Sequence, residues 1–391
     1  MWINRKIASI ILEVSRQYPV VLLTGARQVG KTTLLTRLFN EYDYISFDLP
    51  SIAEQAETNP QLFFSKYNKN IILDEVQYVP EIFRYLKHEV DKDPKRGRFI
   101  LTGSQNFALM KNITESLAGR CAILQLYPLS HSEIHAVKQF DNITDIDFIL
   151  KGGYPKLWSE PETVKEIFFS SYIATYIERD VRNIINIGKI RDFERFFRAL
   201  AIRSSQIVSY SDLARDVGVA VSTIKEWMSV LWASNQIFFL EPYYRNLGKR
   251  LIKSPKVYIT DVGLLCFLLN IKDHDDLMHS PLLGQIWETY VVCQLMIQYS
   301  FKGLKAGMYY WRTRDGSEVD VIMEHGGKII ALEIKFSEFV KGSELTSLKN
   351  LIATVKKERV HCAGVIARTS HRYTIDDIIN VMPLDEALEL I

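Results

Sequence analysis

Apolar residues along the chain fall into short blocks separated by polar and glycine-containing stretches. The blocks at residues 20–23, 44–47, 71–73, 98–101 and 121–126 are typical of short, largely buried strands. Residues 33–39 instead show the apolar spacing of a helix that buries one face. This alternation predicts an α/β fold with a parallel sheet in the first third of the chain.

The pattern changes twice after this region. Residues 141–202 carry aromatic pairs at helical spacing and predict a helical segment. Residues 211–217 and 223–231 predict two short helices, the second capped by Ser222, before strands at 237–240 and 256–259. That order predicts a winged helix. A helix at 285–298, strands at 308–312, 318–322 and 329–335, a helix at 343–356 and a strand at 360–367 follow, in the order αβββαβ.

A glycine-rich loop joins the first predicted strand to the first predicted helix. Its residues match the pattern G-x-x-x-x-G-K-[ST] at every fixed position. Backbone N–H groups and the helix N-terminus would face phosphates, Lys31 would approach the β- and γ-phosphates, and Thr32 would ligate Mg²⁺. We therefore predict that ATP and Mg²⁺ bind here, on Gly25, Ala26, Arg27, Gln28, Val29, Gly30, Lys31, Thr32 and Thr33.

An acid pair, Asp74 and Glu75, ends the predicted strand at 71–73. In a nucleotide site Asp74 would hold the Mg²⁺ shell and Glu75 would polarise the attacking water. The strand from residue 98 ends in small polar residues, of which Thr102 or Ser104 could sense the γ-phosphate or place the water. These residues predict an NTP hydrolase rather than a passive nucleotide binder.

Residues 23–33, 73–77, 101–104, 117–120, 152–155 and 176–180 together resemble AAA+ ATPases. The resemblance is tighter to bacterial and archaeal AAA-type ATPases with a DUF4143 C-terminal region, and it spans nearly the whole chain. It implies a helical lid over the nucleotide. It also implies an arginine finger acting on a neighbouring subunit, with Arg120 as the first choice and Arg179 as a rival. The alternative for Arg120 is a salt bridge within its own subunit, and a finger would require a homo-oligomer.

Composition limits the classes of protein that the chain can belong to. The 391 residues are 47% hydrophobic and 24% charged, and the net charge is +2, so any nucleic-acid contact must come from local patches. The four cysteines are far apart and form no metal-type pairs, and no apolar run is long enough to span a bilayer. We expect a cytoplasmic protein with reduced thiols and no membrane partner.

The region of the predicted wing is basic. It carries Arg245, Lys249, Arg250, Lys253 and Lys256 beside two tyrosines, and these could contact DNA phosphates and bases. The alternatives are a solvated loop or a wing that contacts protein. The predicted recognition helix offers only Lys225, opposed by Glu226, which argues against sequence-specific readout.

The C-terminal αβββαβ order, with Asp320 on one strand and Glu333 and Lys335 on the next, resembles the PD-(D/E)XK restriction-endonuclease-like fold. The resemblance implies that Asp320 and Glu333 hold Mg²⁺, that Lys335 activates water or stabilises charge, and that Glu288 completes the metal shell. Val319 stands where the strictest pattern has proline. Such a domain is either an active nuclease or an inactive DNA-binding or scaffold module.

We therefore predict a P-loop AAA+ core at 1–140, a helical lid at 141–205, a winged helix at 206–260 and a PD-(D/E)XK-like domain at 261–391. The function predicted first is ATP hydrolysis coupled to conformational change on or near DNA. Two alternatives stay open. One is an ATP-controlled, Mg²⁺-dependent DNA nuclease, and the other is a non-catalytic, nucleotide-gated switch that binds a protein partner.

Overall fold

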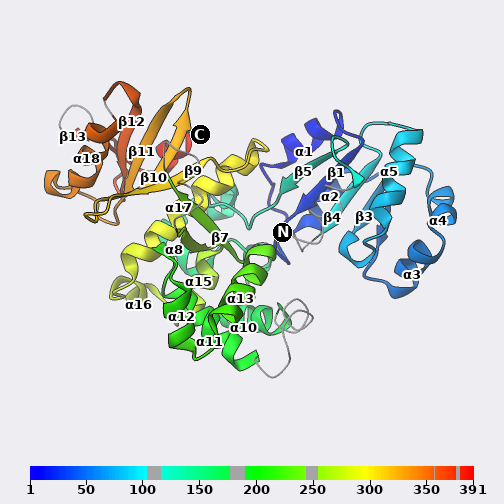
Figure 1. The fold of residues 1–391 in the computed structure, drawn as a ribbon, viewed down its shortest axis with the longest axis horizontal. Coiled ribbons are helices and arrows are strands. Elements are labelled where there is room, and N and C mark those ends of the chain that lie inside the picture. Colours follow the sequence, from blue (N-terminus) through cyan, green and yellow to red (C-terminus); the bar gives the residue numbers. More distant parts are fainter. Residues whose placement is uncertain (104–115, 177–189, 244–253, 356, 376–378) are drawn as a thin grey trace.

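The computed structural model describes residues 1–103, 116–176, 190–243, 254–355, 357–375 and 379–391. Two sheets organise the molecule, and helices lie around and between them (Figure 1). The first sheet, blue to cyan in Figure 1, belongs to the N-terminal third of the chain. The second sheet runs from the green to the red part of the chain.

The first sheet has five strands in the order β2-β3-β4-β1-β5, and every pair in it is parallel. Parallel strands bring all their carboxyl ends to one edge, where α/β proteins bind ligands. The strands are β1 Val20–Thr24, β2 Asp43–Ser46, β3 Ile71–Asp74, β4 Phe99–Gly103 and β5 Cys121–Gln125.

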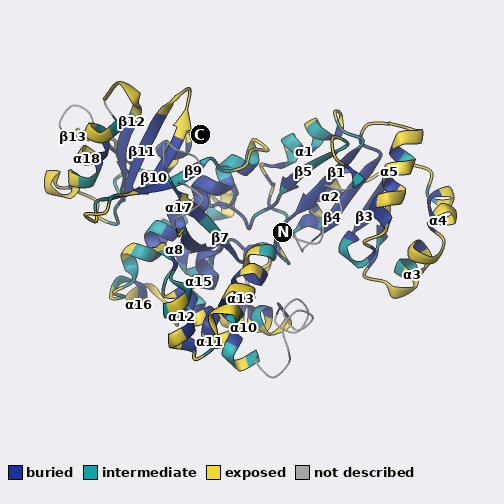
Figure 2. Ribbon diagram, viewed as in Figure 1, coloured by how far each residue is buried: buried dark blue, intermediate teal, exposed yellow. Residues whose placement is uncertain are grey.

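Both faces of this sheet are covered, which explains why its central strands are continuously apolar (Figure 2). Val21 and Leu23 of β1 belong to one buried cluster, together with residues of α1 and α2. Val20 and Leu22 belong to another, with residues of α4 and α5. The helices of this part are α1 Ala8–Ser15, α2 Lys31–Leu38, α3 Pro50–Thr58, α4 Pro60–Lys66 and α5 Ile82–Lys92.

The middle of the chain is mainly helical. Ser209 caps α12 by accepting a hydrogen bond from the Asp212 N–H at 3.3 Å. The predicted cap at Ser222 is wrong, because the next helix begins at Val221, two residues before the predicted start, and follows Ala220. The helices are α7 His131–His135, α8 Asp145–Lys151, α9 Pro155–Ser159, α10 Lys165–Tyr176, α11 Ile190–Ala201, α12 Tyr210–Val217, α13 Val221–Ala233, α15 Val262–Leu268 and α16 His274–Met278.

The second sheet has nine strands in the order β13-β14-β12-β11-β10-β9-β7-β8-β6. In this sheet β7 and β9 are parallel neighbours, with Glu241 opposite Tyr309. The two strands lie on opposite sides of residue 260, the predicted end of the winged helix. The strands are β6 Gln206–Ile207, β7 Ile237–Pro242, β8 Lys256–Ile259, β9 Met308–Arg312, β10 Glu318–His325, β11 Lys328–Ile334, β12 Val360–Ile366, β13 Tyr373–Ile375 and β14 Ile379–Met382.

Three further helices belong to the C-terminal part: α17 Leu283–Phe301, α18 Thr346–Val355 and α19 Leu384–Leu388. The order α17-β9-β10-β11-α18-β12 is the predicted αβββαβ. The predicted α/β class and the predicted parallel sheet in the first third of the chain are confirmed. Within the described residues, no helix is long and apolar enough to cross a membrane.

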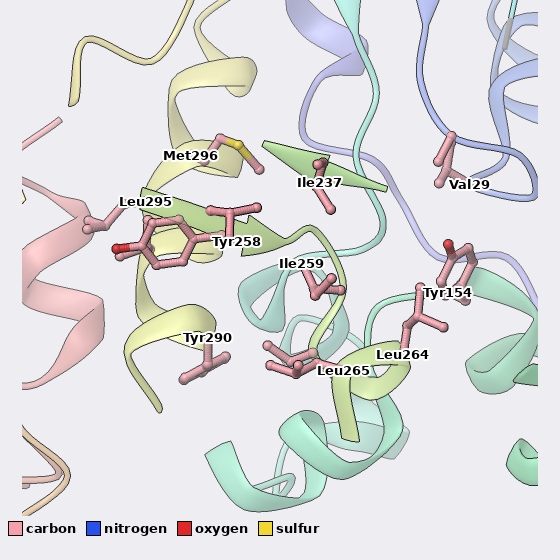
Figure 3. Close-up of a cluster of buried hydrophobic side chains, with 14 of the residues drawn as sticks. Val29, Tyr154, Ile237, Tyr258, Ile259, Leu264, Leu265, Tyr290, Leu295 and Met296 are labelled. Atoms are coloured by element: carbon pink, nitrogen blue, oxygen red, sulfur yellow. The ribbon is translucent and has the colours of Figure 1, made fainter. Parts of the chain in front are cut away.

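A buried carboxylate joins the middle helices to the second sheet. Asp261 follows β8 and accepts hydrogen bonds from the Gly153 N–H at 2.7 Å and the Leu264 N–H at 2.8 Å. Burial raises the pKa of Asp261 to about 6, against the opposing effect of these backbone donors. Figure 3 shows the apolar cluster around this junction, in which Tyr258 and Ile259 of β8 lie with Leu264 and Leu265 of α15.

Backbone approaches very closely at the same junction. A Cβ atom on Gly263 of α15 would lie 2.5 Å from the Lys151 carbonyl oxygen and 2.6 Å from the Gly152 nitrogen. Only glycine leaves room for this contact between α15 and the end of α8.

We predict that Gly263→Ala lowers the free energy of unfolding by about 1–3 kcal/mol, because the backbone on both sides must shift. Gly284→Ala is the matched control, since a Cβ atom there meets nothing within 4 Å. It should leave stability unchanged or raise it by up to about 1 kcal/mol. Urea denaturation measures both. If both variants lost the same free energy of unfolding, the interpretation that Gly263 is closely packed would be contradicted.

Candidate functional site

The glycine-rich loop has the backbone that its sequence predicts. Gly25, Gln28 and Gly30 have φ of 148°, 61° and 92°, and α2 begins directly after them. A Cβ atom on Gly25 would lie 2.2 Å from the Leu126 carbonyl oxygen, so no larger residue fits. Lys31 is 5% exposed, and its ammonium group donates to the carbonyl oxygens of Gly25 at 3.0 Å and Ala26 at 2.8 Å. The loop therefore encloses a buried cation.

Asp74 connects the loop to three other elements at the carboxyl edge of the sheet. Its carboxylate accepts hydrogen bonds from the Thr32 hydroxyl at 2.9 Å, the Tyr44 hydroxyl at 2.8 Å and the Thr102 hydroxyl. Burial and then the hydrogen bond to Asp74 raise the pKa of Tyr44 to about 12, so Tyr44 remains a donor. The oxygens of Thr32 and Asp74 are the kind of ligand that Mg²⁺ prefers, and they fit a metal bound together with a nucleotide.

Glu75 follows in a left-handed conformation, with φ of 57°. This conformation is uncommon for residues other than glycine and marks a constrained position. The Glu75 N–H donates to the Thr102 hydroxyl at 3.1 Å, and the Gln77 amide donates to the Glu75 carboxylate. Thr102 therefore contacts both members of the acid pair. Ser104, the other predicted sensor, lies outside the described residues.

Arg5 is a residue of this site that sequence reasoning missed. It is buried, and it donates to the carbonyl oxygens of Val29 in the loop at 2.8 Å and of Tyr127 at 2.7 Å. Its third partner is Glu133, at 3.2 Å and equally buried. Arg5 thereby links the glycine-rich loop to Tyr127 and Glu133. No local pattern points to it, because its charged partner lies 128 residues away in the sequence.

The structure brings the predicted C-terminal residues together. Asp320 on β10 accepts a hydrogen bond from the Ile334 N–H of β11 at 2.8 Å. The Lys335 ammonium group lies 3.3 Å from the Glu333 carboxylate. Glu288 of α17 approaches Asp320 closely enough for the two charges to interact. We call Glu288, Glu318, Asp320 and Glu333 the C-terminal acidic centre.

Lys256, which was predicted to lie on the wing as a DNA contact, is instead buried in this centre. Its side chain is 2% exposed, and its Nζ lies 2.9 Å from Glu288, 2.6 Å from Glu318 and 3.5 Å from Asp320. The prediction of a DNA contact for Lys256 is wrong for this conformation, because the side chain is out of reach of a phosphate. The other four basic residues of the wing lie outside the described residues.

Burial also changes the ionisation of the centre. Burial, and then the charge of Asp320, raise the pKa of Glu288 to about 7 and that of Glu333 to about 8. Burial acts to lower the pKa of Lys256, but the negative charges around it outweigh burial and raise that pKa. In the described part of the chain, no group of three or more His, Cys, Asp or Glu side chains is arranged to hold a metal ion.

Three family models match the chain in succession. They are an AAA domain over residues 17–135, the domain of unknown function DUF8612 over 145–275, and the domain of unknown function DUF4143 over 283–387. The uncharacterized protein Rv2008c of Mycobacterium tuberculosis is 30% identical over 387 residues, which are 98% of this chain and 84% of that protein. The chain belongs to this family. It is an AAA-type P-loop ATPase domain with a DUF4143 C-terminal region.

More distant similarities extend over most of the chain. The uncharacterized protein MJ1544 of Methanocaldococcus jannaschii is 23% identical and covers 93% of this chain and 87% of its own length. Among solved structures, the Walker-type ATPase PABY2304 of Pyrococcus abyssi is 17% identical, covers 69% of this chain and 96% of its own, and gives a TM-score of 0.47. The RuvB Holliday junction branch migration motor of Thermotoga maritima covers 60% and 89%, is 17% identical and gives a TM-score of 0.31.

Arg120 of this AAA domain lies directly before β5, at the amino edge of the sheet. The loop of the same chain follows the carboxyl end of β1, at the opposite edge. Arg120 Nε donates to the Asp91 carboxylate at 2.6 Å, and both side chains are more than a third exposed. The alternative for Arg120, a salt bridge within its own subunit, is therefore present. A role toward a neighbouring subunit stays a prediction, and Arg179 lies outside the described residues.

We predict that Arg120→Ala lowers the free energy of unfolding by no more than about 1 kcal/mol, because exposed ion pairs contribute little. Arg5→Ala is the contrasting variant. It should cost about 3–5 kcal/mol, since it leaves Glu133 charged and buried. Chemical denaturation of both variants measures the difference. A large loss in Arg120→Ala would show that its pair with Asp91 is a main structural contact.

Proposed function

We propose that this protein binds ATP at the glycine-rich loop and hydrolyses it, and that hydrolysis drives a rearrangement of the parts that follow the ATPase core. The observation that carries the proposal is the hydrogen bond between Thr32 and Asp74, at 2.9 Å. It places the two predicted oxygen ligands together, beside Lys31 and next to Glu75. Sequence positions more than 40 residues apart thus meet at one edge of the sheet.

Each residue then has a defined task. The loop backbone and Lys31 bind the β- and γ-phosphates, and the Lys31 ammonium group exchanges its carbonyl partners for phosphate oxygens. Thr32 and Asp74 would hold Mg²⁺, which supplies charge neutralisation at the phosphates when bound. Glu75 orients the attacking water and accepts its proton as the bond between the γ-phosphoryl group and ADP breaks. Ser104 or Thr102 would position the water or sense the γ-phosphate.

Contacts between the glycine-rich loop and the segment before α9 would transmit a change in the shape of the loop to the parts of the chain that follow. A Cβ atom on Gly30 would lie 3.9 Å from Pro155 at the start of α9, so the loop and the segment before α9 are neighbours. Val29 and Tyr154 belong to the same buried cluster, and Figure 3 shows both. The adjacent Gly153 is held by Asp261 at the end of β8. A change in loop shape on nucleotide binding would therefore act on the lid at 141–205 and, through it, on the second sheet.

DNA is the partner that we propose for the winged helix at 206–260. The support is the basic sequence of its wing, together with the order α12-α13-β7-β8. Within the described residues, α13 exposes one lysine, Lys225, next to the exposed Glu226. That helix offers little for reading bases, so contact with phosphates is proposed and sequence-specific readout is not.

One observation favours a second function, a nucleotide-gated switch whose C-terminal part contacts a protein partner and does no chemistry. The PD-(D/E)XK-like domain at 261–391 would need Mg²⁺ at Asp320 and Glu333 to cut DNA. The Lys256 ammonium group already lies among the acids of this centre in the structure. A Mg²⁺-dependent nuclease is therefore not proposed for this conformation.

We predict that Lys31→Ala abolishes productive ATP binding, because the cation beside the phosphates is lost. Glu75→Gln should keep ATP binding and reduce turnover by about 10²-fold or more, because an amide cannot accept the proton of the water. Phosphate release and equilibrium binding of a fluorescent ATP analogue measure the two effects. Parallel assays with duplex and single-stranded DNA test whether DNA changes turnover. Near-normal turnover by Glu75→Gln would disprove the role of Glu75.

A second prediction concerns subunits. If Arg120 acts on a neighbour, Arg120→Ala should bind ATP normally and hydrolyse it poorly. Mixing it with Glu75→Gln should then restore part of the activity, because some interfaces combine an intact Glu75 with an intact Arg120. The stability of Arg120→Ala, measured as above, controls for misfolding. Full turnover by Arg120→Ala, or by a protein that stays monomeric with ATP, would rule this role out.

A further inference from the structure

We propose that the Lys256 ammonium group is the resident cation of the C-terminal acidic centre and takes the place of a divalent metal. The centre would then hold its carboxylates together without Mg²⁺ or Mn²⁺. This inference concerns the second sheet and does not depend on ATP hydrolysis by the first.

The geometry around Lys256 is that of a cation enclosed by its ligands. A lysine ammonium group has three N–H donors, and three carboxylates surround this one, on Glu288, Glu318 and Asp320. They come from α17 and from two positions of β10 that lie two residues apart on one face of the strand. The Tyr258 hydroxyl adds a hydrogen bond to Glu288 at 2.7 Å.

A divalent ion and the Lys256 ammonium group cannot share these oxygens. Magnesium needs several oxygen ligands at about 2.0–2.1 Å, in near-octahedral order. Two of the four acids already face an ammonium group at 2.9 Å and 2.6 Å, and an oxygen of Asp320 accepts the Ile334 N–H at 2.8 Å. An added metal ion would meet the positive charge of Lys256 inside a buried site, where little water screens the repulsion.

Lys256 is also held in place by its backbone. It is the first residue of β8, and it pairs with Ile207 of β6 on one side and with Leu240 of β7 on the other. Its Nζ lies 5.8 Å from the centre of the Tyr310 ring. Because this strand position is internal to the sheet, the backbone of Lys256 is fixed on both sides and holds the side chain next to the acids.

The acids explain why the cation is needed. Unpaired carboxylates are costly to bury, so each needs a cation, a proton or hydrogen-bond donors. The Lys335 ammonium group, partly exposed directly after β11, forms an ion pair with Glu333 at 3.3 Å. The buried Lys256 ammonium group contacts the other three acids. Two lysines of the chain therefore already contact the acids that resemble a metal-binding motif.

The test is a Mn²⁺ titration of the full-length, nucleotide-free protein, followed by electron paramagnetic resonance of the free ion. In wild type, no Mn²⁺ site should depend on Asp320, so wild type and Asp320→Asn should bind the same amount of Mn²⁺. Lys256→Met keeps an unbranched side chain that is one atom shorter, and it removes the charge. It should bind Mn²⁺ at least about tenfold more tightly than wild type, because divalent affinity rises with uncompensated ligand charge. The double variant Lys256→Met with Asp320→Asn should lose this gain.

Thermal melting provides an independent measurement if Lys256→Met folds poorly. Mn²⁺ should raise the melting temperature of Lys256→Met relative to EDTA and leave wild type unchanged. Arg98→Met is the matched control, because Arg98 is also nearly buried but pairs with the Glu89 carboxylate at 2.9 Å, outside the C-terminal acidic centre. It should gain no response to Mn²⁺. Two results would overturn the proposal: a wild-type Mn²⁺ site that needs Asp320, or a folded Lys256→Met with neither tighter binding nor metal-dependent melting.

Discussion

The buried carboxylate of Asp261 is the contact on which the arrangement of the whole chain depends. It accepts N–H groups from Gly153, on the segment that follows the ATPase core, and from Leu264 in α15. A Cβ atom on Gly152 would lie 2.4 Å from this carboxylate, so glycine is required beside it. One side chain thus links the segment around Gly153, the end of β8 and α15 to one another.

The described residues also contain two ionic centres, which are built in opposite ways. At the nucleotide site, Asp74 gathers hydroxyl donors and leaves its charge available for a metal. At the C-terminal acidic centre, a lysine is already placed among the acids. The first arrangement suits a site that gains and loses a charged ligand in each cycle. The second suits a part of the molecule whose charge remains balanced throughout.

The sequence predicted what depends on local order and missed what depends on distant partners. Strands β1, β3 and β4 follow from continuous apolar blocks, and the loop at residues 25–32 follows from its glycines and lysine. The approach of Glu288 to Asp320 was implied by the resemblance to the PD-(D/E)XK fold. Lys256 was misplaced, because a basic stretch looks exposed in a sequence, whereas its acids lie 32 to 64 residues further along the chain. The roles of Arg5 and Tyr44 have no local signal at all.

The parallel pairing of β7 with β9 also affects how the chain can be divided. The two strands lie on opposite sides of residue 260, and the Tyr243 N–H continues their contact by donating to the Tyr310 carbonyl oxygen at 2.6 Å. A chain cut there would leave each half with a strand whose hydrogen-bonding groups face solvent. Such bare edges pair readily with other molecules and lead to aggregation. The strands of the DUF4143 region and the preceding β6, β7 and β8 therefore form one continuous sheet, and we expect them to fold as one unit.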